Sequence, residues 1–156
     1  SVFTNVGVRL ELWRAAGMLI EDAPLLGRSE EGYRKLLEAD VRRGVLDPVV
    51  LTMPHFHNET LQALVTGGVL GFAAWFGVML APFVFFARAV GAKGASRQES
   101  ALALAGVLVV TSYFGYGLTE VIFWSLKGAT FYALMVFLLM GFYLNAKDAS
   151  RQPGAV

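Results

Sequence analysis

The sequence predicts an all-α, polytopic membrane protein in which a polar helical segment precedes three transmembrane helices. Two observations carry this prediction. Of the 156 residues, 56 % are hydrophobic and 16 % charged, and the mean hydropathy of +0.56 is higher than an ordinary soluble domain has. The apolar residues are also gathered into long runs without a charged side chain, and about 20 such residues span a bilayer core.

The first of these runs is the longest. From Thr60 to Ala87, 28 residues pass without a charged side chain, and two further apolar runs follow it. At a rise of about 1.5 Å per residue, each run is long enough to cross the hydrocarbon core. We therefore predict transmembrane helices at about 61–87, 100–122 and 128–146, the first of them with an entry turn around Gly67-Gly68.

Charge bias gives these helices an orientation. The loop after the first span and the tail at 147–156 are both basic, and three spans put them on the same side of the membrane. Residues 1–60 carry 7 basic and 9 acidic side chains and fall on the other side. Since basic residues in short loops mark the cytoplasmic face, we expect residues 1–60 to face the periplasm or the exterior.

The polar segment reads as a small helical loop. Apolar residues at helical spacing predict an amphipathic helix within 1–22, and a proline follows its end. A second helix is predicted at 30–43, with Ser29 as its N-terminal cap and Gly44 at its C-terminal end. An extended piece is expected at 49–53. These helices are too few to form a stable fold alone, so we expect the segment to lie on a membrane domain.

Composition excludes several classes of function. The chain has no cysteine, so disulfide frameworks and thiolate chemistry are excluded. Its formal net charge of +1 gives no electrostatic basis for binding nucleic acid.

The stretch that joins the polar segment to the first span carries the candidate chemistry. It holds both histidines of the chain, His55 and His57, and Asn58 is predicted to cap the helix that leads into the membrane. A helix N-terminus beside His57 favours a neutral imidazole that can accept a proton. The plainer alternative is that both histidines are interfacial loop residues. A metal site of His55, His57 and Glu59 is disfavoured, because a helix that begins at Asn58 breaks their alternation and no fourth ligand is evident.

Three charged residues complete the set of candidates. Two arginines are candidates for phosphate binding: Arg9, which is beside Trp13 on the first helix, and Arg14. A guanidinium group can donate two hydrogen bonds at once to a phosphate. Glu120 lies at the outer end of the second span, where an ionisable group is a site candidate. The alternatives are a solvated face for the arginines and an interfacial carboxylate for Glu120.

Several motifs resemble the O-antigen ligase family of bacterial envelope glycosyltransferases. The pattern H-N-x9-G-x-x-G of that family is matched in register by His57, Asn58, Gly68 and Gly71, while Thr66 stands where many members carry a glutamate. In that family the last periplasmic loop opens with the pattern R-x3-W. Arg9 and Trp13 match this pattern. The stretches that carry the resemblance are VRLELWRAA at 8–16, PLLG at 24–27, HFHNETLQ at 55–62 and GVLG at 68–71.

The resemblance implies the carboxyl-terminal part of a GT-C-like membrane glycosyltransferase of about a dozen spans, so further arginines of the site would lie upstream. Its reaction would be a metal-independent transfer without a cofactor, in the bacterial inner membrane and facing the periplasm. The donor would be an undecaprenyl-diphosphate-linked glycan and the acceptor a sugar hydroxyl of lipid A-core. His57 would be the catalytic base, and Arg9 would hold the diphosphate. The further substrate-binding residues would be Arg14, His55, Asn58 and Glu120.

Two alternatives remain open from the sequence. An O-antigen polymerase or a protein O-oligosaccharyltransferase of the same family would use the same residues with another acceptor. A non-catalytic membrane subunit or a transporter fragment would need the histidines only as structural residues. In each case the isolated chain is expected to be inactive, because three spans cannot build a donor cavity that a dozen helices form.

Overall fold

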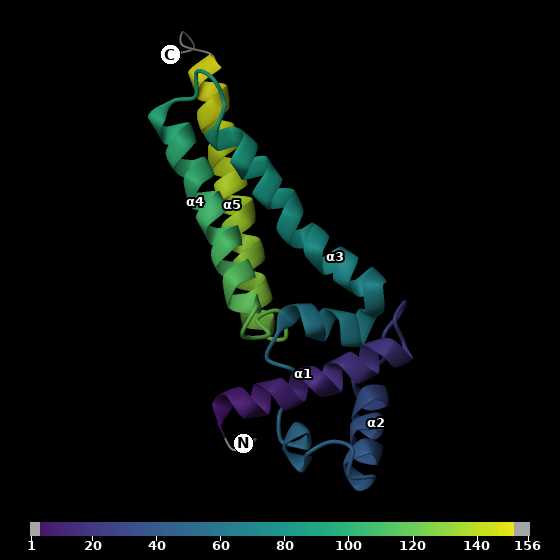
Figure 1. The fold of residues 1–156 in the computed structure, drawn as a ribbon. Coiled ribbons are helices and arrows are strands. Elements are labelled where there is room, and N and C mark those ends of the chain that lie inside the picture. Colours follow the sequence, from purple (N-terminus) through teal and green to yellow (C-terminus); the bar gives the residue numbers. More distant parts are fainter. Residues whose placement is uncertain (1–3, 152–156) are drawn as a thin grey trace. The chain divides into compact units, whose positions relative to one another are not determined.

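The computed structural model describes residues 4–151 and is helical throughout (Figure 1), which confirms the predicted all-α fold. The described residues contain no strand. The helices are α1 (Asn5–Asp22), α2 (Glu30–Arg42), the short 3₁₀ helix η1 (Pro48–Leu51), α3 (Glu59–Val90), α4 (Arg97–Gly117) and α5 (Leu126–Arg151).

Three of these helices, α3, α4 and α5, are long and apolar enough to cross a membrane, as predicted. Their bounds differ from the expected ones at several ends. The second helix ends earlier than expected, at Gly117, and the third continues to Arg151, into the segment expected as a tail. The last part of that tail, 152–156, lies outside the described residues.

The chain divides into two compact units. The first contains the residues up to Phe76 together with Gly117–Val121, and the second contains Gly77–Tyr116 and the residues from Ile122 onward. The candidate site residues, from Arg9 to Glu120, all belong to the first unit.

The first unit is built from the helices that the sequence predicts. Ser29 caps α2 by accepting a hydrogen bond from the backbone N–H of Gly32, and Gly44 follows α2 in the left-handed conformation with φ 71°. α1, α2, η1 and the start of α3 meet in one apolar core. Its buried residues are Leu12, Ala15, Ala16, Leu19, Tyr33, Leu37, Leu46, Val50, Phe56 and Val65.

The extended piece predicted at 49–53 is wrong. The chain instead forms η1, because Asp47 caps it by accepting from the N–H of Val49 and Pro48 occupies its first position. Proline suits the first helical position, where its missing N–H costs no hydrogen bond and its fixed φ is already helical. Val50, which lies in the segment expected to be extended, is buried as part of this helical turn.

A break at Gly68 divides α3 (Figure 1), where the sequence predicts an entry turn at Gly67-Gly68. Gly68 has φ 60° and ψ −157°, a conformation open to glycine alone. The backbone of residues 24–28 lies against the break: the N–H of Val69 donates to the carbonyl of Pro24 at 2.8 Å, and Arg28 N–H donates to the carbonyl of Val65 at 2.8 Å. A Cβ at position 68 would lie 2.3 Å from the backbone of Leu25, so the close contact also requires glycine.

The second unit contains α3 from Gly77 onward, α4 up to Tyr116, and α5. Beyond the break, α3 has 22 residues, from 69 to 90, and is therefore about 33 Å long, enough to span a bilayer core. Near the loop that joins α3 to α4, Ala89, Ala103 and Tyr143 pack together from the three helices.

Replacing Gly68 by alanine is expected to lower the free energy of unfolding by about 3 kcal/mol or more, because the backbone conformation and the contact with Leu25 both exclude a Cβ. Gly67→Ala is the matched control, since position 67 has open space for a Cβ. Thermal unfolding in detergent, followed by circular dichroism, measures both variants. Equal stability of the two variants would contradict this account of the break.

Candidate functional site

The candidate site lies where three parts of the first unit meet: α1, the stretch that precedes α3, and the turn that follows α4. At its centre, Nδ1 of His57 lies 3.1 Å from Oε2 of Glu120, although the two residues are 63 positions apart in the sequence. A carboxylate accepts hydrogen bonds and donates none, so Nδ1 carries the proton in this contact. The remaining ring nitrogen, Nε2, is then the one that can accept a proton.

Arg9 joins the same carboxylate from α1. Its Nη2 lies 3.4 Å from Oε1 of Glu120, so the carboxylate is shared between the guanidinium and the imidazole. The side chains of Arg9, Glu120 and His57 are 38 %, 48 % and 22 % exposed, respectively. Ion pairs with this much exposure contribute little to folding stability. The three groups remain accessible to a ligand.

Asn58 determines where Glu120 lies. Its Oδ1 accepts from the N–H of Leu61 at 3.0 Å, which confirms it as the cap of α3. Its Nδ2 donates to the carbonyl of Leu118 at 3.1 Å and thereby ties the turn after α4 to the start of α3. Gly117 allows this approach, because a Cβ there would lie 3.2 Å from the side chain of Glu59.

The backbone next to His57 is fixed by buried neighbours. Trp13 Nε1 donates to the carbonyl of Phe56 at 3.1 Å, and the N–H of Phe56 donates to Oε1 of the buried Gln62 at 3.3 Å. The ring of Phe56 is buried against Tyr33, with ring centroids 5.5 Å apart. The sequence did not identify Gln62 as a site residue. Only the structure shows that its side chain is buried and accepts a hydrogen bond from the backbone of Phe56, ahead of α3.

His57 itself has φ 48°, which is the left-handed conformation that residues with a Cβ rarely adopt. His55 supports it: its Nδ1 accepts from the N–H of His57 at 3.3 Å, and the two rings lie edge to face with centroids 4.4 Å apart. Burial and the neighbouring His57 lower the pKa of His55, while Glu120 partly opposes them. A protonated His55 would lose the acceptor that holds the backbone of His57.

Arg14, the remaining predicted site residue, pairs with Glu11 in the structure. Its Nη1 lies 3.3 Å from Oε1 of Glu11, an oxygen that also accepts from the N–H of Asp47 at 3.1 Å. The pair thus links α1 to the start of η1. A role for Arg14 in binding a substrate stays a prediction.

The structure also bears on which residues could hold a metal ion. His55, His57 and Glu120 each offer one ligand atom, and these atoms lie within 4.8 Å of one another. Glu59, the carboxylate considered from the sequence, is buried, and its side chain lies against Gly117. Two donors of the group already have partners, since Nδ1 of His55 accepts a backbone N–H and Glu120 pairs with Arg9. The arrangement fits a base with its carboxylate more closely than an open coordination site.

Comparison with known proteins agrees with the resemblance read from the motifs. Residues 2–76 match the family described as O-Antigen ligase, and this range includes Arg9, both histidines, Asn58 and the Gly68 break. An uncharacterized protein of Haemophilus influenzae is 23 % identical over 138 residues, which are 87 % of this chain and 34 % of that protein. The chain therefore spans about a third of the length of the curated relative that it matches.

We predict that His55 titrates below its ordinary pKa of 6.5, because burial and His57 disfavour its charged form. NMR titration of the ring protons can test this directly, since the chain contains two histidines and His55→Gln assigns them. A lowered pKa in the folded state means that His55 favours folding fully above about pH 6.5 and loses part of that contribution as the pH falls below it. Titration at or above 6.5 would contradict the prediction.

Proposed function

Because residues 2–76 match the O-antigen ligase family, we propose that this membrane protein transfers a glycan from undecaprenyl diphosphate to a sugar hydroxyl of lipid A-core. The reaction completes lipopolysaccharide at the periplasmic face of the bacterial inner membrane. The proposal rests on one observation, that His57 and Arg9 both contact the carboxylate of Glu120.

His57 is the general base of the proposed reaction. With Nδ1–H donating to Glu120, Nε2 takes the proton of the acceptor hydroxyl while its oxygen attacks the anomeric carbon of the donor. Glu120 then stabilises the imidazolium and keeps the ring in one tautomer. The bond between the anomeric carbon and the diphosphate oxygen breaks as the new glycosidic bond forms.

Arg9 serves the leaving group. The undecaprenyl diphosphate gains negative charge as it departs, and a guanidinium stabilises such charge by paired donation. In the structure Arg9 shares Glu120 with His57, so its charge lies next to the base. A shift of Arg9 toward a bound diphosphate would leave the carboxylate to the imidazolium.

The chain supplies part of the catalytic machinery. The chain spans 34 % of the length of its Haemophilus relative, and the remaining parts of the donor site are proposed to lie outside these 156 residues. The transfer experiments below therefore use the natural full-length protein.

Replacing the base is expected to abolish transfer. In a ligase-deficient bacterial strain that expresses the natural protein, His57→Ala should remove the O-antigen ladder from a lipopolysaccharide gel, since a general base contributes about 10²- to 10⁴-fold. Glu120→Gln keeps an acceptor but removes the charge, and should weaken the ladder at least about tenfold. Arg9→Ala should also weaken it, while the same change at the exposed Arg42, which pairs with Glu38 on α2, controls for lost charge.

Protein levels from an immunoblot separate lost activity from lost protein. A full ladder with His57→Ala at a normal level would refute the assignment of the base. His55→Ala tests the residue that supports His57, and Arg14→Ala tests the remaining arginine. If the wild type gives no ladder, the acceptor is wrong, and polymerase or protein-transferase assays follow.

Chelation tests the proposed absence of a metal requirement. Transfer by the purified natural protein is expected to be the same within twofold in excess EDTA and in added Mg²⁺ or Zn²⁺, because arginine, not a divalent ion, stabilises the diphosphate. Loss of activity in EDTA that Zn²⁺ restores would instead assign His55, His57 and Glu120 as metal ligands.

A further inference from the structure

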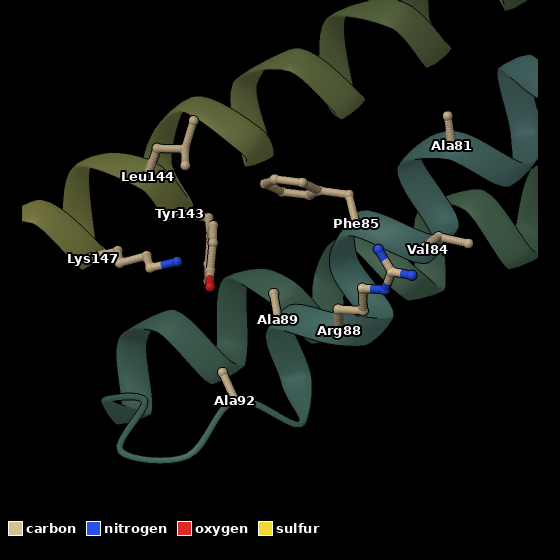
Figure 2. A pocket seen from close by; sticks show the side chains of 9 residues that line it. All are labelled: Ala81, Val84, Phe85, Arg88, Ala89, Ala92, Tyr143, Leu144 and Lys147. Carbon is tan, nitrogen blue, oxygen red and sulfur yellow. The ribbon is translucent and has the colours of Figure 1, made fainter.

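A groove separates α3 from α5 near the loop that follows α3, within the second unit. Its volume is about 390 Å³. Two helical stripes face each other across it (Figure 2). On α3 the stripe runs from Ala81 to Arg88 and Ala89 at spacings of three and four, and on α5 it includes Tyr143, Leu144 and Lys147. Alanines on the α3 side leave the space that larger side chains would fill.

Two cations from different helices face this groove. Arg88 comes from α3 and Lys147 from α5, and of the described residues that line the groove none is acidic. The ammonium of Lys147 lies 5.7 Å from the ring centroid of Tyr143, which in turn packs edge to face on Phe85 at 5.6 Å. A cation held over an aromatic ring is partly immobilised before a ligand arrives. Basic side chains at a membrane interface attract anionic headgroups.

The surrounding charges favour an anionic surface. The segments 88–99 and 147–151 carry three basic residues besides Arg88 and Lys147, namely Lys93, Arg97 and Arg151. The acidic residues of these segments are Glu99 and Asp148. The two acidic residues are not among those that line the groove. By charge bias this end lies at the cytoplasmic leaflet, where anionic lipids attract basic residues.

A second, mostly apolar cavity adjoins the groove. This cavity of about 590 Å³ between α3 and α5 shares Ala81 and Phe85 with the first, and its further lining is almost wholly apolar. On α5 the combined lining runs over 19 residues, from Ala129 to Lys147, a rise of about 27 Å. A ligand with a phosphate at one end and a hydrocarbon chain at the other fits both parts.

We propose that this groove binds an anionic glycerophospholipid of the cytoplasmic leaflet. Its phosphate lies between Arg88 and Lys147, and one acyl chain follows α5 past Phe85 into the apolar cavity. The proposal goes beyond the glycan transfer proposed above and does not depend on it, because its residues lie in the second unit and the site residues in the first.

Native mass spectrometry of the natural protein in mild detergent tests this binding. The protein is titrated with dioleoyl phosphatidylglycerol or with dioleoyl phosphatidylcholine, which share their chains and differ in net charge. The wild type should prefer phosphatidylglycerol. The double variant R88Q/K147Q should lose this preference by on the order of tenfold, since each basic residue near the headgroups contributes to the attraction. The exposed pair K93Q/R97Q, which removes equal charge outside the groove, should keep it within twofold.

A further variant separates the lipid from its phosphate alone. Ala81 is exposed and lines both cavities, so Ala81→Trp should obstruct the chain path and lower binding of phosphatidylglycerol severalfold with both cations intact. Millimolar inorganic phosphate should not displace the lipid from the wild type. Full displacement, with unchanged binding to Ala81→Trp, would show a site for phosphate alone and overturn the proposal. Equal losses in both double variants, or no preference in the wild type, would overturn it too.

Discussion

The side chain of Asn58 is the interaction on which the candidate site depends. One of its ends satisfies an N–H at the start of α3, and the other holds the carbonyl of Leu118. A helix cap is a local device, and here the same amide group also fixes a turn that is distant in the sequence. The carboxylate of Glu120, two residues beyond Leu118, is thereby held against His57 and Arg9. The cap therefore decides both where a helix begins and which charges meet beside it.

Such an arrangement explains why some of the structure could be predicted and some could not. Signals confined to a few residues gave correct results: Ser29 and Asn58 cap helices, Gly44 follows one, and the glycine pair at 67–68 breaks another. The charge-free runs also predicted the three long helices, because a bilayer imposes a length on them. In each case the physical cause acts within the segment that carries the signal.

Other features depend on contacts that the local sequence does not contain. The contact of Glu120 with His57 is supported by the amide of Asn58, which holds Leu118, and by the close approach of Gly117 to Glu59. The role of Gln62 follows from burial beside Phe56, which no local pattern indicates. The segment 49–53 is different, because the cap from Asp47 and the proline after it are local signals and favour a helical turn. The prediction of extended backbone did not take them into account.

The break at Gly68 has a mechanical consequence. Hydrogen bonds transmit bending along a continuous helix, but Val69 and Leu70 donate to Pro24 and Leu25 rather than to the preceding turn of α3. A spanning helix changes its tilt when the thickness of the bilayer changes. With the ladder of hydrogen bonds interrupted at Gly68, a bend in the segment that begins at Val69 is not passed along the backbone of α3 to the segment from Glu59 to Gly67. It acts first on the turn at Pro24 and Leu25, whose carbonyl groups accept the hydrogen bonds.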